Sequence, residues 1–216
     1  MSKEYEAKFL DIDAAKARIK LKTIGAKLVH RRKRYTRMVF KRCTDEVRGF
    51  ARVRNEGGVV TMTVKLYKDP KFPEEYEVTI HDDFDKGASF LKALGLEVKA
   101  FQETYREKWS HPLVHEITFD EIPGIPVYME VDCTGENKLN KVIRLLELDK
   151  TKMRFGAFDA TYNEYYGIPK DVLNDKTPSL TFKNIIREIK PTKNKELLRK
   201  MQKMYKDKVS RYASKK

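Results

Sequence analysis

The feature that most constrains the fold is an alternation of charged and apolar residues that recurs along the chain. It opens with EYEAKF at residues 4–9, where Glu4, Glu6 and Lys8 are separated by single apolar residues. Because successive side chains of a strand point to opposite faces, a period of two predicts a strand with one charged and one apolar face. The pattern returns in FARVRN (50–55), PEEYEV (73–78), YREKW (105–109) and YMEVD (128–132).

The segments between these stretches are short, which favours an antiparallel meander over alternating β-α-β units. Helical periodicity and glycine or aspartate at the ends predict helices over 11–24 and 82–94. A third helix is expected over 138–148. Strands are expected over 4–9, 28–42, 49–55, 59–68, 73–81, 99–110, 114–121 and 127–134.

Same-sign charges stand two residues apart on several of these strands. The pairs are Arg52 with Arg54, Glu75 with Glu77, Arg106 with Lys108, and Glu130 with Asp132; Lys65 follows the alternating TMTV. For any one strand, a face that is simply solvated explains such charges. Like charges repel, however, so their repetition favours a bridging ligand or ion of opposite sign. We therefore expect a closed barrel whose polar interior binds a polyanion together with Mg²⁺ or Mn²⁺.

Most of the positive charge lies near the end of the chain. Residues 176–216 carry +11 of the formal net charge of +14. We expect one domain over residues 1–175 and a basic, partly helical extension over 176–216. The extension contains a basic amphipathic helix, which either packs on the domain or contacts RNA, an acidic partner or a polyanionic substrate. No run of eighteen apolar residues appears, so we expect a cytoplasmic protein without membrane contact.

The charged residues resemble the CYTH family, also called triphosphate tunnel metalloenzymes. The family's opening ExExK motif matches Glu4, Glu6 and Lys8. The later elements follow in order: Arg52 and Arg54, Lys65, Glu75 and Glu77, Arg106, Asp120, Glu130 and Asp132. The resemblance covers residues 1–168 and ends in YNEYYGI (162–168), which is similar to a bacterial and phage-type subgroup. Two positions depart from the family: Thr104 replaces a common lysine, for which Lys108 can substitute, and Asp132 replaces a common glutamate.

The resemblance implies an α+β fold: a closed, eight-stranded antiparallel tunnel with helices packed outside and, here, a C-terminal basic helix. It also implies metal-dependent cleavage of a triphosphate. Catalytic roles fall on Glu4, Glu6, Lys8 and Glu130. Phosphate binding falls on Lys8, Arg52, Arg54, Lys65, Arg106 and Lys108. Metal binding falls on Glu4, Glu6, Glu75, Glu77, Asp120, Glu130 and Asp132.

Three functional classes remain open. A triphosphatase would act on inorganic triphosphate, thiamine triphosphate, a nucleotide or an RNA 5′ end, the last reached through the basic extension. A class IV adenylyl cyclase would make cyclic AMP and pyrophosphate from ATP. A non-catalytic binder of nucleotide or polyphosphate is disfavoured because both the acidic and the basic residues are present. We rank the triphosphatase first, since no residue pattern identifies a pocket for a base. The oligomeric state is not predicted.

Overall fold

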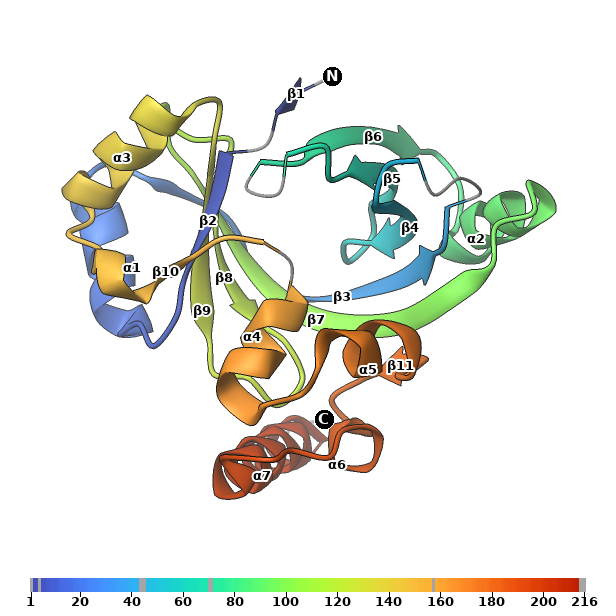
Figure 1. Ribbon diagram of the computed structural model, residues 1–216. Helices are drawn as coiled ribbons and strands as arrows, with labels where there is room; N and C mark the ends of the chain where they lie inside the picture. Colours follow the sequence, from blue (N-terminus) through green and yellow to red (C-terminus); the bar gives the residue numbers. More distant parts are fainter. Residues whose placement is uncertain (1, 4, 43–45, 70–71, 157, 214–216) are drawn as a thin grey trace.

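The computed structural model describes residues 2–3, 5–42, 46–69, 72–156 and 158–213, which form one strongly curved sheet with helices on its outer side (Figure 1). The strands are β1 (Ser2–Lys3), β2 (Tyr5–Phe9), β3 (Lys27–Phe40), β4 (Gly49–Asn55), β5 (Val60–Leu66), β6 (Glu74–Ile80), β7 (Val98–Ser110), β8 (Glu116–Glu121), β9 (Tyr128–Cys133), β10 (Met153–Arg154) and β11 (Ser179–Leu180). The helices are α1 (Ala14–Thr23), α2 (Phe84–Ala93), α3 (Glu136–Leu145), the short η1 (Lys150–Lys152), α4 (Phe158–Tyr166), α5 (Lys170–Asp175), α6 (Ile185–Glu188) and α7 (Lys195–Ala213).

The expectation of a closed eight-stranded barrel is wrong. The strands follow an open path in the order β1-β6-β5-β4-β3-β7-β8-β9-β2-β10, with β11 added in parallel beside β7. The reason lies in β2, which has β9 on one edge while β10 pairs with Phe9 and Lys8 on the other. Along the part of the chain that the structure describes, β6 pairs beyond β5 only with the two-residue β1. The sheet is therefore curved but not closed.

The apolar face of the sheet packs against helices. Helices α1 and α3 lie against β2, β8 and β9, and their shared cluster buries Leu21, Leu139, Phe9 and Val131. Glu107 breaks the apolar pattern on this face, but its carboxylate accepts hydrogen bonds from Arg18 Nε and Trp109 Nε1, both at 2.8 Å. A partly buried carboxylate with one charged and one neutral donor costs little free energy, so β7 can keep its alternation.

Aspartates cap the first two helices: Asp83 caps α2, as the sequence predicts, and Asp13 caps α1, two residues after the expected start. The Asp13 carboxylate accepts from the backbone N–H groups of Ala15 and Lys16, and Asp83 accepts from Lys86 N. These bonds satisfy donors that have no partner within the helix.

The C-terminal segment packs on the sheet through a second apolar cluster. Tyr162 and Tyr166 of α4 are fully buried there and donate their hydroxyls to the carbonyls of Pro123 and Gly124. Leu198 of α7 belongs to the same cluster, and the ring of Tyr205 stacks on Phe182 at 5.0 Å. Figure 1 shows α4, α5, α6 and α7 gathered on one side of the sheet. Within the described ranges, none of the helices has the length and apolar content needed to cross a membrane.

We expect Leu198→Ala to lower the free energy of unfolding by about 2–4 kcal/mol, because it leaves a cavity in this cluster. Leu198 is 3 % exposed, whereas Met204 on the same helix is 43 % exposed. Urea denaturation should therefore show a loss of less than about 1 kcal/mol for the control Met204→Ala. Equal losses would mean that α7 does not support the fold through Leu198.

Candidate active site

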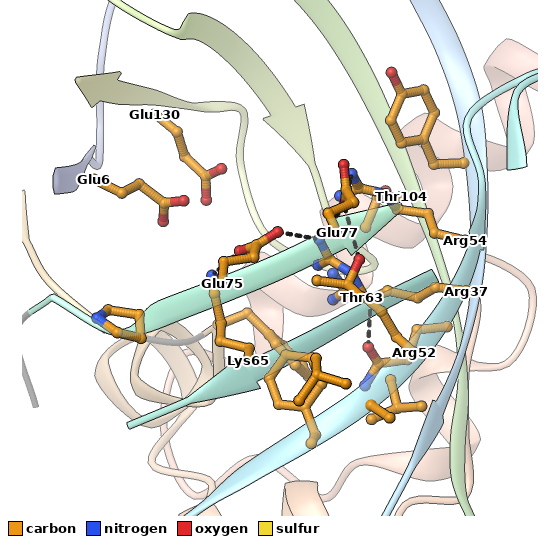
Figure 2. Close-up of a pocket in the computed structure, with 18 of the residues that line it drawn as sticks. Glu6, Arg37, Arg52, Arg54, Thr63, Lys65, Glu75, Glu77, Thr104 and Glu130 are labelled. Atoms are coloured by element: carbon orange, nitrogen blue, oxygen red, sulfur yellow. Dashed lines mark hydrogen bonds and ion pairs between the residues drawn. The ribbon is translucent and has the colours of Figure 1, made fainter. Parts of the chain in front are cut away.

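The concave side of the sheet holds a charged pocket of about 1000 Å³. Twelve of the residues predicted from the sequence line it: Glu6, Lys8, Arg52, Arg54, Lys65, Glu75, Glu77, Arg106, Lys108, Asp120, Glu130 and Asp132. Figure 2 shows Glu6 and Glu130 on one wall and Lys65, Glu75 and Arg52 on the other. Glu4 lies outside the described residues.

Strand register brings these residues together. Residues that are directly opposite in neighbouring strands point to the same face of a sheet. Glu6 is opposite Asp132 and Lys8 is opposite Glu130, where β2 pairs with β9. Lys65 is opposite Glu75 where β5 pairs with β6. A period of two along each strand then carries the charged face across the whole sheet.

Arginines from the neighbouring strands β3 and β4 form the basic part of the pocket. Arg52 donates to the Thr63 hydroxyl at 3.1 Å and to Glu75 and Glu77 at 3.2 and 3.4 Å. Arg37 of β3 donates to the Gln102 amide oxygen at 2.7 Å. Burial and the nearby Arg52 lower the pKa of Arg37 to about 10. A bound anion would stabilise the charged form of Arg37, because its negative charge would offset both the cost of burial and the repulsion from Arg52.

Arg106 joins three carboxylates at the floor of the pocket. Its guanidinium contacts both oxygens of Asp120 at 2.7 and 2.5 Å, Glu116 at 3.0 Å and Glu130 at 2.8 Å. Burial raises the pKa of Asp120 to about 7 although Arg106 opposes this. Burial also disfavours the Glu130 anion, but Lys8 and Arg106 outweigh it and lower the pKa of Glu130 to about 2.

The acidic wall combines Glu6, Glu130 and Asp132. The Lys8 ammonium lies between two of them, in contact with Glu6 and 3.1 Å from Glu130. Oδ1 of Asp132 is buried and has no hydrogen-bond partner in the structure as described. Burial, followed by the charges of Glu6 and Glu116, raises the pKa of Asp132 to about 8.

These carboxylates have the chemistry that a hard divalent cation requires. A cation would supply a positive charge to balance the Asp132 carboxylate. Carboxylate oxygens are suitable ligands for Mg²⁺ or Mn²⁺. Among the described residues, no three acidic, histidine or cysteine side chains converge into a ready-made metal site. Lys8 occupies part of the space between Glu6 and Glu130, so their binding of a cation would require its ammonium to shift.

Asp132→Asn should stabilise the metal-free protein, and more so at higher pH. The folded-state pKa of about 8 lies above the unfolded value of about 3.9, so ionising Asp132 destabilises the fold increasingly as pH rises between these values. We expect the gain in the free energy of unfolding to be about 2 kcal/mol larger at pH 8 than at pH 5, allowing for partial exposure. Denaturation in EDTA measures this; a pH-independent gain would contradict the cause.

Sequence reasoning missed several charged residues that line the pocket: Arg37, Arg48, Glu56, Lys99, Glu116 and Asp159. Glu116 contacts Arg106 and Lys108, and its parity with Asp120 on the strand expected over 114–121 could have identified it. Arg37 is hidden in the basic run RRKRYTR, where β3 shifts register against β7 between His30 and Lys33. Such irregularities interrupt the alternation that assigns a face, so parity alone does not find Arg37.

Comparison with known families and structures agrees with this fold. Residues 2–161 match the CYTH domain, and the chain belongs to the CYTH domain family. A candidate adenylate cyclase from Vibrio parahaemolyticus has a TM-score of 0.62 at 15 % identity, over 74 % of this chain and 97 % of that one. The PH1819 protein of Pyrococcus horikoshii OT3 has a TM-score of 0.57 at 23 % identity, over 74 % and 98 %. Among curated protein sequences, none matches.

Proposed function

We propose that this protein is an enzyme that cleaves a triphosphate substrate in the charged pocket, with a divalent metal. The observation that carries the proposal is that basic residues and acidic residues line the same pocket on the concave face of the sheet. Arginines supported by Thr63, Gln102 and carboxylates stand opposite an acidic wall in which the buried Oδ1 of Asp132 has no hydrogen-bond partner among the described residues. Both features suit a triphosphate that is bound together with a divalent cation. The catalytic unit in this proposal is residues 1–175.

The basic residues bind the phosphates. The pocket is lined by the guanidinium and ammonium groups of Arg37, Arg52, Arg54 and Lys65. An arginine can form bidentate hydrogen bonds with phosphate oxygens. Burial and Arg52 lower the pKa of Arg54 as well, although Glu56 and Glu77 oppose them. Positive charge held in a partly dry pocket stabilises the charge that develops as a phosphoryl group is transferred.

The acidic residues hold the metal and orient the bases. The proposed metal ligands among the described residues are Glu6, Glu130 and Asp132. Glu4 is added because it belongs to the ExExK motif. When bound, the metal neutralises phosphoryl oxygens and acidifies water. Glu75 and Glu77 fix Arg52 and Lys65 through ion pairs of 3.1–3.4 Å. Lys108 and Asp120 act mainly through their contacts with Glu116 and Arg106.

Incubation with tripolyphosphate, ATP, thiamine triphosphate and a 5′-triphosphorylated RNA tests the proposal. Each substrate is supplied with Mg²⁺, with Mn²⁺ or with EDTA, and the products are separated. We expect release of phosphate with either metal and none in EDTA. Cyclic AMP with pyrophosphate would instead identify a cyclase, and no cleavage of any substrate would contradict an enzymatic role. A steep salt dependence confined to RNA would indicate that the basic extension contacts it.

A further inference from the structure

The lining of the pocket changes from charged to aromatic along two neighbouring strands. On β4 the concave face carries Arg54, then Arg52, then Phe50. On β5 it carries Thr63 and Lys65, and Tyr67 follows directly after the strand. Because alternate residues share a face, Phe50 and Tyr67 extend the same surface as the phosphate-binding bases. Their ring centroids are 6.4 Å apart.

A third aromatic ring and small apolar residues complete this end of the pocket. Phe158, at the start of α4, lies 5.2 Å from the Arg37 guanidinium carbon, measured to the ring centroid. Val39 and Ala100 line the pocket at the same end of β3 and β7, opposite each other. The aromatic end therefore directly adjoins the phosphate-binding Lys and Arg side chains: Phe50 is opposite Lys65, and Phe158 is beside Arg37.

A polar amide is held at the aromatic end by a buried carboxylate. Asn174 of α5 lines the pocket, and its Nδ2 donates to Asp159 Oδ2 at 2.8 Å. Asp159 is 3 % exposed and also accepts from Ala160 N. A side-chain amide fixed in this way can pair with the donors and acceptors on the edge of a heterocycle.

We propose that this end of the pocket binds a planar aromatic ring attached to the triphosphate, so that the substrate is a ring-bearing triphosphate rather than inorganic triphosphate. The inference rests on the proposed function for the position of the phosphates. An inorganic phosphate chain has no ring that could stack on aromatic side chains, whereas a heterocycle is stabilised by stacking on them. Phe50, Tyr67 and Phe158 are half-buried and line the pocket, where the Arg48 guanidinium lies 5.7 Å from the centroid of the Tyr67 ring.

The test is calorimetric binding of ATP, thiamine triphosphate and tripolyphosphate in EDTA, where no metal-dependent cleavage occurs. We expect one of the two ring-bearing compounds to bind at least about tenfold more tightly than tripolyphosphate. Phe50→Leu should reduce that ratio by about tenfold, as expected for loss of one stacking partner. Which compound is preferred distinguishes a purine from a thiamine ring.

The control is Phe90→Leu, since Phe90 is 59 % exposed on α2 and does not line the pocket. It should leave the ratio unchanged. If Phe50→Leu is poorly folded by circular dichroism, Tyr67→Leu, just beyond β5, is measured in its place. Equal or tighter binding of tripolyphosphate, or a ratio unaffected by the variants, would overturn the inference. Binding without any cleavage in the metal assay would refute the proposed activity while leaving this inference standing.

Discussion

Glu130→Gln is expected to lower kcat/KM for triphosphate cleavage by about 10²–10³-fold while leaving the fold intact. Glu130 is 9 % exposed, and its pKa of about 2 keeps it ionised at neutral pH. The substitution removes a charge that is proposed to hold the metal and that fixes Lys8 and Arg106, at nearly constant volume. Steady-state kinetics with Mg²⁺ or Mn²⁺ measure the loss, and thermal denaturation checks the fold.

Two companion variants sharpen this result. Glu6→Gln should cause a loss of similar size, because Glu6 shares Lys8 with Glu130. The control is Glu97→Gln, an exposed residue whose side chain pairs with Lys41 at 3.0 Å. It should retain full activity. Activity within a factor of about three of the unsubstituted protein in the Glu6→Gln/Glu130→Gln double variant would show that these carboxylates take no part in the reaction.

Arg106→Leu is expected to have the largest effect on stability. It leaves Asp120, Glu116 and Glu130 without their shared cation, and breaking a buried ion pair in this way costs about 3–5 kcal/mol. The control Arg187→Leu removes a guanidinium that is 80 % exposed and should change the free energy of unfolding by less than about 1 kcal/mol.

The pH dependence of Arg106→Leu identifies the cause. Loss of Arg106 raises the folded-state pKa values of all three carboxyl partners. The pKa of Asp120 already lies above its unfolded value, whereas Arg106 helps to hold the pKa values of Glu116 and Glu130 below theirs. Their ionisation then destabilises the fold more as pH rises, so the deficit should be smaller at pH 5 than at pH 8. A deficit that is independent of pH would point to lost packing of the Arg106 side chain instead.

The period-two alternation carried most of the information on the sheet. It predicted a strand over 49–55, which is β4 (Gly49–Asn55), because side-chain parity is fixed by the backbone of an extended chain. The same parity placed Arg52, Lys65 and Glu130 on one face, and the structure brings them into one pocket. Their catalytic roles stay predictions.

The alternation of charged and apolar residues could not predict that the sheet stays open, nor could it predict the aromatic end of the pocket. The open edge arises because the distant β10 pairs with β2, and a two-residue strand leaves little local pattern. Phe158 and Asn174 come from α4 and α5, far along the chain from Phe50. Only tertiary packing places them beside β4, so their sequence context resembles that of ordinary core and loop residues.

The most direct test of the account is anomalous X-ray diffraction from crystals grown with Mn²⁺ and tripolyphosphate. We expect the manganese peak beside Glu6 and Asp132, and the phosphates in contact with Arg37, Arg52 and Lys65 on the opposite wall of the same pocket. A manganese peak away from these carboxylates, or tripolyphosphate bound outside the concave face of the sheet, would contradict the proposal that this pocket is the active site.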